Sequence, residues 1–144
     1  MGNPQNEKIA TRGFEAFNTG DLSIADEVTA DNAVNHDPAQ PEDTRGPEGF
    51  KQVIQLYRGG FPDLHIEIDE QFSDGDLVCT RWTSSGTNDG ELMGMPPTGK
   101  HATSSGISID KIENGKIVES WVQWDNLGLM QQLGVGAEAG AAAG

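Results

Sequence analysis

The sequence predicts an α+β fold in which helices precede an antiparallel sheet. In the first part of the chain, apolar side chains recur at helical spacing. After residue 63 they alternate with polar ones, as in strands that bury one face, and turn sequences separate consecutive strands. We therefore expect the sheet to wrap against the helices.

Two helices are predicted at the start of the chain. The first covers residues 4–18, with Pro4 in its first turn and Thr19-Gly20-Asp21 at its end. Ser23, with Asp26 three residues later, resembles a capping box. That pattern predicts a second, short helix that runs to about residue 29.

A third helix, between Gly46-Pro47 and Gly59-Gly60, precedes four long strands. The strands are expected from residue 63 onward and at about 77–87, 101–112 and 116–125. Asp74-Gly75-Asp76 and Asn114-Gly115 are hairpin turn sequences between them. A short apolar helix or turn follows from Asn126 to Leu133.

Length and composition indicate one domain. The chain has 144 residues and is 35% hydrophobic, which is enough for a single core. We expect the domain to span residues 1–134. Residues 135–144 are rich in Gly and Ala with little to bury, so we expect a flexible tail there.

The charge balance excludes several classes of partner. Twenty-three acidic residues against nine basic ones give a formal charge of −14, and no segment concentrates Lys and Arg. Nucleic acid and anionic membranes are therefore not expected as partners. The dispersed acidity is typical of a solvated surface, with adaptation to high salt as the alternative.

The sequence also predicts a cytoplasmic protein. No apolar stretch approaches the roughly 18 residues that cross a membrane, and the first residues lack the pattern of a signal peptide. Cys79 is the only cysteine, which excludes an internal disulfide and favours a reducing compartment.

Neither a nucleotide site nor a metal site is predicted. Residues 94–101 nearly match a phosphate-binding loop, but two prolines remove backbone amides and His101 replaces the hydroxyl that binds magnesium. His36, His65 and His101 lie far apart and in no ligand spacing.

Polar side chains that could form a functional site occur at two places in the sequence. At the first, Asn35, His36 and Asp37 follow one another after the second predicted helix. Carboxamide, imidazole and carboxylate groups can donate hydrogen bonds or transfer protons. We treat these three residues as candidates for a site.

The second place is the end of the last predicted strand. Strand alternation puts Trp121, Gln123 and Asp125 on one face, opposite Val122 and Trp124. A carboxylate buried beside tryptophans is desolvated and becomes a usable acid or base near neutral pH. Asp125 also precedes an apolar helical run, and these residues alone favour the N-cap of that helix as its role.

Short motifs along most of the chain carry a family resemblance. They are Phe17-Asn18-Thr19-Gly20-Asp21, Asn35-His36-Asp37-Pro38, Gly46-Pro47-Glu48-Gly49-Phe50, Phe61-Pro62-Asp63-Leu64, Gly86-Thr87-Asn88-Asp89-Gly90, Met93-Gly94-Met95-Pro96-Pro97-Thr98-Gly99-Lys100, Gly115-Lys116-Ile117-Val118-Glu119-Ser120-Trp121 and Asp125-Asn126-Leu127-Gly128-Leu129-Met130-Gln131-Gln132-Leu133-Gly134. Together they resemble the SnoaL-like polyketide and ester cyclases of the nuclear transport factor 2-like fold.

The resemblance implies a cone-shaped, cystatin-like α+β barrel, in which a curved antiparallel sheet and three N-terminal helices enclose an apolar pocket, and a homodimer. It implies an enzyme without metal or cofactor, acting on a small hydrophobic molecule that contains carbonyl groups. In the family's cyclases an Asp at the position matching Asp125 acts as general acid and base. It takes a proton from a carbon between two carbonyls and returns one to the oxygen formed when the enolate attacks another carbonyl.

Further site residues follow from this resemblance. We expect Asn35 and His36 to assist catalysis, and Asn35, His36 or Gln123 to donate a hydrogen bond to the enolate oxygen. The substrate-binding residues are expected to be Trp82, Trp121, Gln123, Asn88 and Asp37. Asn88 stands where many relatives have His, and an amide cannot shuttle protons near neutral pH.

Three alternatives remain open. Asp37 falls where ketosteroid isomerases of the same fold have their general base, but those enzymes use a tyrosine of the first helix, and Tyr57 lies in the third. Epoxide hydrolases of this fold need an Asp-Arg-Asp triad, and Arg81 with Asp125 lacks the second acid. A non-catalytic, dimeric module that binds a hydrophobic ligand also fits the fold.

Overall fold

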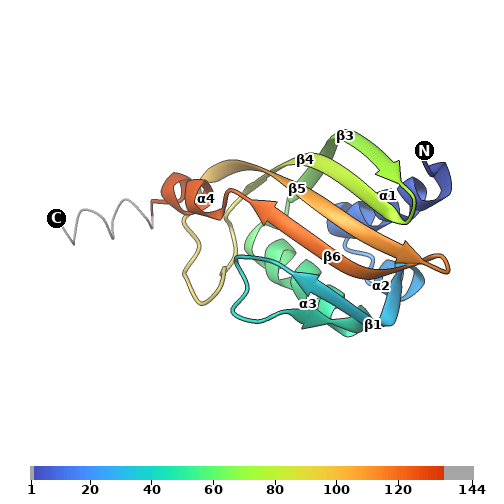
Figure 1. Cartoon of the computed structure of the whole chain (residues 1–144). Helices are drawn as coiled ribbons and strands as arrows, with labels where there is room; N and C mark the ends of the chain where they lie inside the picture. Colours follow the sequence, from blue (N-terminus) through green and yellow to red (C-terminus); the bar gives the residue numbers. More distant parts are fainter. Residues whose placement is uncertain (1, 135–144) are drawn as a thin grey trace.

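In the computed structural model, which describes residues 2–134, four helices pack with a curved six-stranded sheet (Figure 1). The helices that come first in the chain cover one face of the sheet, here called the inner face. The opposite, outer face carries no helix in the described part of the chain. The predicted α+β class is confirmed, and the tail expected at residues 135–144 lies outside the described residues. Within residues 2–134, no helix has the length and apolar character required to cross a bilayer.

The helices begin and end close to the predicted positions. They are α1 (Pro4–Thr19), α2 (Ser23–Val28), α3 (Gly46–Gly60) and α4 (Asn126–Gln132). At the start of α1, the side chain of Asn3 accepts a hydrogen bond from the backbone N–H of Asn6. α1 ends at Gly20, which has a left-handed φ of 76° that residues with a Cβ adopt at a cost.

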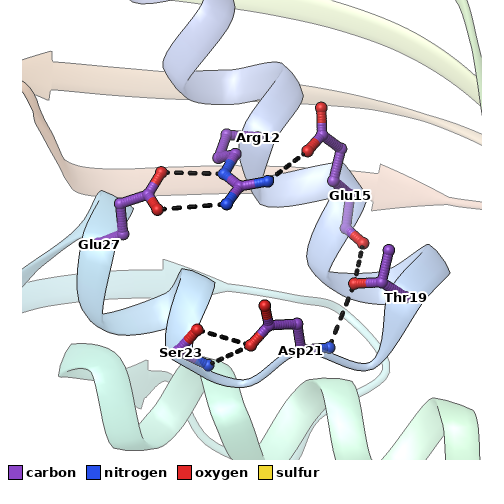
Figure 2. Close-up of polar contacts among 6 residues, drawn as sticks. All are labelled: Arg12, Glu15, Thr19, Asp21, Ser23 and Glu27. Atoms are coloured by element: carbon purple, nitrogen blue, oxygen red, sulfur yellow. Dashed lines mark hydrogen bonds and ion pairs between the residues drawn. The ribbon is translucent and has the colours of Figure 1, made fainter.

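The turn between α1 and α2 is built differently from the prediction. Ser23 and Asp26 do not form a capping box. Instead, the carboxylate of Asp21 accepts hydrogen bonds from the backbone N–H (3.0 Å) and the hydroxyl (2.6 Å) of Ser23 (Figure 2). Arg12 of α1 binds Glu27 of α2 at 2.9 Å, and this exposed pair fixes the two helices only weakly.

The sheet is mixed rather than antiparallel. Its strands are β1 (Thr29–His36), β2 (Thr44–Arg45), β3 (His65–Asp74), β4 (Leu77–Thr87), β5 (His101–Glu113) and β6 (Lys116–Trp124). Their order across the sheet is β2-β1-β6-β5-β4-β3, with β3 to β6 joined as the predicted hairpins. However, β1 lies parallel to β6. The sheet curves without closing, so the expected barrel is open.

The sequence prediction missed β1 and β2 for a physical reason. Polar residues at consecutive positions in β1 hide the alternation that marks a strand, and β2 is only two residues long. The parallel pairing joins segments from the two halves of the chain, a contact that no local pattern reveals.

Two apolar clusters hold the helices against the inner face. One, under α1 and α2, contains Ala10, Ala16, Ile24, Val28, Ile54, Val78, Ile112 and Ile117. The other, beside α4, contains Phe61, Leu92, Ala102, Leu129 and Leu133. Members of both clusters line a cavity on the inner face, so the cavity lies between two packed regions.

Candidate active site

A cavity of about 170 Å³ lies between the inner face of the sheet and the helices α1 and α3. Much of its wall is apolar, including Phe14, Phe17, Phe50, Val53, Trp82, Val122, Trp124 and Leu129. Such a wall suits a hydrophobic ligand that is bound through its surface area and oriented by a few polar groups.

Three polar side chains lie in one row across the cavity wall. In the register of the sheet, Asn35 of β1 is beside Ser120 of β6, and Ser120 is beside Asp110 of β5. All three line the cavity. Because neighbouring strands are about 4.8 Å apart, the row spans roughly 10 Å. We call Asn35, Ser120 and Asp110 the inner polar row.

Asp110 is the acid of this row, and it is buried, with 7% of its surface exposed. One oxygen accepts a hydrogen bond from the hydroxyl of Ser120 (2.5 Å). Loss of hydration raises the pKa of Asp110 from 3.8 to about 6, against the opposite effect of the Ser120 hydrogen bond. A carboxyl group of this kind changes its protonation close to neutral pH, as a general acid or base must.

Asp37 also lines the cavity, immediately after β1. One oxygen accepts hydrogen bonds from the indole N–H of Trp124 (2.8 Å) and the backbone N–H of Ala39 (2.9 Å). The other oxygen accepts one from the hydroxyl of Tyr57 (3.2 Å). Burial raises the pKa of Tyr57, and the nearby charge of Asp37 adds to this effect. Asp37 therefore joins β1, α3 and β6 at one point of the wall.

Asp125 and Gln123 lie outside this cavity. The exposed Asp125 carboxylate accepts a hydrogen bond from the backbone N–H of Gly128 (2.8 Å), as the N-cap of α4. Gln123 is exposed on the outer face. The predicted alternation of β6 is correct, but the cavity lies on the face of Val122 and Trp124. The structure therefore does not place Asp125 and Gln123 in this cavity, and the N-cap interpretation of Asp125 is correct.

His36 and Trp121 stack on each other on the outer face, with ring centroids 5.9 Å apart. The imidazole lies between the carboxylates of Glu119 (2.7 Å) and Asp43 (3.0 Å). The hydrogen bond with Glu119, followed by that with Asp43, raises the pKa of His36. Neither ring lines the cavity, so the structure does not bring His36 and Trp121 together with the candidates that do. His36 follows Asn35 in β1 and Trp121 follows Ser120 in β6, so both side chains lie on the face opposite the inner polar row.

Asn88 has a structural position. It is almost completely buried, and its amide nitrogen donates to the carbonyls of Gly60 (3.0 Å) and Gly90 (2.9 Å). Its amide oxygen accepts from the backbone N–H of Thr98 (2.9 Å). These bonds hold the loop between β4 and β5, and Asn88 does not line the cavity that it was expected to reach.

Asn35 and Trp82 are the candidates that the structure places in the cavity together with Asp37. The indole N–H of Trp82 donates to the hydroxyl of Ser108 (3.0 Å), which fixes the ring against the sheet. Their roles toward a substrate stay predictions, but their positions agree with a binding wall.

Asp110 was missed because β5 reverses the usual pattern of a half-buried strand. Its polar residues Ser108 and Asp110 face inward, whereas Ile107 and Ile109 face outward. A prediction that buries the more apolar face of each strand therefore places the wrong face of β5 inside. One feature of the sequence could have indicated the inward face. Ile112 lies two residues after Asp110, on the same side of β5, and it belongs to the core.

Within residues 2–134, no group of three or more His, Cys, Asp and Glu side chains is arranged to hold a metal ion. The residues that line the cavity offer carboxylates, hydroxyls and one carboxamide instead. This set can donate and accept hydrogen bonds and transfer protons.

Comparison with known proteins finds relatives that match most of this chain. The chain is 31% identical over 132 residues to the aklanonic acid methyl ester cyclase DnrD of Streptomyces peucetius, covering 88% of each chain. It is 28% identical over 123 residues to the nogalonic acid methyl ester cyclase of Streptomyces nogalater, covering 83% of this chain and 90% of that one.

The crystal structure of wild-type IdmH from Streptomyces antibioticus has the same fold, with a TM-score of 0.77 and 36% identity over 91% of this chain and 99% of that one. The family model of the SnoaL-like polyketide cyclases matches residues 8–133. The resemblance carried by the motifs is thereby confirmed, and the chain belongs to the SnoaL-like polyketide cyclase family.

Proposed function

We propose that this chain closes a ring in a small polyketide ester by intramolecular aldol addition, with a cavity carboxylate as acid and base and with no metal or organic cofactor. The observation that carries this proposal is an apolar cavity with two carboxyl groups, those of Asp37 and Asp110, in its wall. Two relatives are named for the cyclisation of methyl esters of aklanonic and nogalonic acid, which supports this class of substrate.

The chemistry suits the cavity because the substrate brings both reacting carbons. The protein has to fold the substrate, exclude water, take a proton from a carbon between two carbonyls and return it to the new hydroxyl. The rings of Trp82 and Trp124 offer flat apolar area for a polyketide. The carboxamide of Asn35 can donate a hydrogen bond to the enolate oxygen.

An isomerase that uses Asp37 as its base is less well supported. The carboxylate already accepts hydrogen bonds from Trp124, Ala39 and Tyr57. Three of the four lone-pair positions of a carboxylate are therefore occupied. Tyr57 directs its hydroxyl hydrogen at Asp37, so it does not stabilise an oxyanion as an isomerase requires. The contacts of Asp37 hold the wall together.

The function is tested by incubating the purified chain with aklanonic acid methyl ester and, separately, with nogalonic acid methyl ester. Chromatography with mass detection should show a product of unchanged mass and new retention time, because an aldol closure is an isomerisation. The Asp125→Asn variant keeps the N-cap and should turn over at the rate of the natural chain. Tight binding of both esters without turnover would identify a binding module instead.

We also propose that the enzyme is a homodimer joined through the outer face of the sheet. Phe72, Ile109 and Trp121 fall in one row of the sheet register and are 60%, 37% and 39% exposed. An exposed apolar row of this kind is typical of an interface. At its edge, Arg81 pairs with Glu70, so a second copy can cover the row without burying a lone charge there.

Light scattering at several concentrations tests the dimer. The natural chain should have twice the mass of its sequence, and Ile109→Glu should give the monomer because it places a charge in the row. Glu113→Gln, at the exposed last residue of β5, is the matched control and should leave the dimer intact. A natural chain that stays monomeric at all concentrations would contradict this part of the proposal.

We place the enzyme in the cytoplasm as part of the same proposal. Cys79 is a free thiol, and burial raises its pKa, which keeps it protonated and unreactive. A chain whose one cysteine stays reduced suits a reducing compartment. Cell fractionation with an antibody to the chain checks the location.

A further inference from the structure

The inner polar row contains one carboxyl group, that of Asp110, and its role in the cavity wall is still to be explained. Asp110 lies on the inner face of β5, in the cavity wall, with little of its surface exposed. Burying a carboxylate costs free energy unless it is fully paired. Asp110 accepts one hydrogen bond, from Ser120, and no cation among the described residues offsets its charge. Packing does not explain why the fold keeps an acid at this position.

The neighbours of Asp110 form a setting suited to enolate chemistry. Ser120 separates Asp110 from Asn35 in the row, so a base and a hydrogen-bond donor face the same part of the cavity from opposite sides. A carbon between two carbonyls, placed over Ser120, would have Asp110 on one side. Its carbonyl oxygen would face Asn35 on the other.

We propose that Asp110 is the general base and acid of the cyclisation, that Ser120 orients its carboxyl group, and that Asn35 stabilises the enolate oxygen. This inference rests on the proposed function and names the residue that performs its proton transfers. The inference assigns the proton transfers to neither Asp125 nor Asp37. Asp125 caps α4 on the outside of the fold, and Asp37 accepts hydrogen bonds from Trp124 and Tyr57 of the cavity wall.

The reaction balances without any further reagent. Asp110 takes the proton from the carbon between the two carbonyls, and the electrons of that C–H bond form the enolate. The enolate carbon then forms the new C–C bond with the second carbonyl carbon, whose π electrons pass to its oxygen. The protonated Asp110 gives its proton to that oxygen, so the product is an isomer of the substrate and Asp110 is ionised again.

The surroundings of Asp110 also predict the pH dependence. On the adjoining strands its neighbours in the register are Val78 and Ser120, which carry no charge. Asp37 is the other carboxyl group in the cavity wall, and Cys79 is a titratable neighbour on the opposite side of β4. The rate should therefore follow the ionisation of Asp110 and rise through about pH 6.

The experiment separates proton abstraction from ring closure. A β-keto ester analogue that lacks the second carbonyl cannot cyclise, but its acidic carbon exchanges hydrogen for deuterium in D₂O, as followed by NMR. The natural chain should accelerate this exchange above the buffer rate. Asp110→Asn should reduce the acceleration by roughly 100-fold or more, the usual contribution of a general base. Asp37→Asn tests the other carboxyl group of the cavity wall. The outer-face control Asp125→Asn should retain the acceleration.

A second variant tests the orienting role of Ser120. Because its hydrogen bond lowers the pKa of Asp110, Ser120→Ala should move the rising limb of the pH–rate profile to higher pH. A purely structural serine would lower the rate at all pH values without moving that limb. Thermal unfolding of each variant shows that the measured protein is folded.

The outcomes distinguish the two proposals. Exchange by the natural chain that depends on Asp110, without ring closure of the full esters, would support Asp110 as the base for proton abstraction and overturn the proposed ring closure. Ring closure that survives Asp110→Asn would do the reverse. Exchange lost in Asp37→Asn but kept in Asp110→Asn would overturn the assignment of the base, as would the absence of accelerated exchange by the natural chain.

Discussion

The two faces of β5 differ in a direction opposite to that of an ordinary half-buried strand. The inner face presents Ser108 and Asp110, which are almost fully buried, whereas the outer face presents Ile107 and Ile109, which are 47% and 37% exposed. In a sheet that only covers a core, the isoleucines would be inside. The inner face is polar because it borders a cavity as well as a core.

The comparison teaches that neither face of β5 has the composition that packing within a single chain favours. Buried polar groups cost stability, and an exposed apolar row lowers solubility, so neither is explained by folding alone. The proposed substrate in the cavity and the proposed second copy on the outer face would account for both. Substitutions on one face at a time can test the two explanations separately.

The largest effect is expected from the buried acid of the inner face. The rise of the Asp110 pKa from 3.8 to about 6 corresponds to about 3 kcal/mol of unfolding free energy. Because the folded state holds this proton more tightly than the unfolded state, stability falls as the pH rises from about 4 to 6 and stays reduced above it. Asp110→Asn should therefore be more stable than the natural chain by up to about 3 kcal/mol at pH 8.

Urea unfolding at pH 4, 6 and 8 measures this difference. The two chains should be nearly equal at pH 4 and diverge as the pH rises. A variant that is less stable than the natural chain at pH 8 would show that the ionised Asp110 is well stabilised in the fold, contrary to its desolvation.

The next largest effect is expected where two cavity tryptophans meet. Gly106 lies on the inner face of β5, and a Cβ there would come within 2.5 Å of Trp82 and 2.7 Å of Trp124. Gly106→Ala should displace both rings and destabilise the fold by about 2 kcal/mol. Ile107→Ala, the adjacent outer-face control, should cost less than about 1 kcal/mol in the monomer. Denaturant midpoints compare the two, and equal losses would argue against a tightly packed cavity wall.

A smaller effect is expected at the N-cap of α4. Asp125→Ala removes the hydrogen bond to the backbone N–H of Gly128 and should cost about 1 kcal/mol. Asp125→Asn should cost almost nothing, since asparagine caps equally well. Both variants should cyclise substrate at the natural rate per folded molecule. A large loss of turnover in Asp125→Asn, with its stability intact, would return the catalytic role to this residue.

The smallest effect is expected at His36 on the outer face. Its pKa is raised by Glu119 and Asp43, so the stability it contributes is present below pH 6.5 and is lost as the pH rises through the higher folded-state value. Because the pair is at the surface, we expect no more than about 0.5 kcal/mol. His36→Gln should lower the unfolding free energy at pH 5.5 and leave it unchanged at pH 8.5. An equal loss of unfolding free energy at both pH values would indicate that His36 stabilises the fold by stacking on Trp121 rather than by its charge.

The candidate site shows how far sequence reasoning reached. Alternation correctly separated Trp121, Gln123 and Asp125 from Val122 and Trp124, yet it could not tell which set faces a cavity. That choice depends on where α1 and α3 pack, which a strand's own residues do not encode. The aromatic residues on both faces of β6 made the two orientations equally acceptable.

The sequence by itself determined the helices, the hairpin-linked strands and the family, because helix caps, turn residues and side-chain periodicity act over a few neighbours. Only the tertiary structure decided that β1 joins the sheet beside β6 and thereby brings Asn35 next to Ser120 and Asp110. These residues are distant in the chain, and their meeting depends on the packing of the whole inner face. The charge state of Asp110 depends on the same packing, since desolvation arises only when other elements remove water from it.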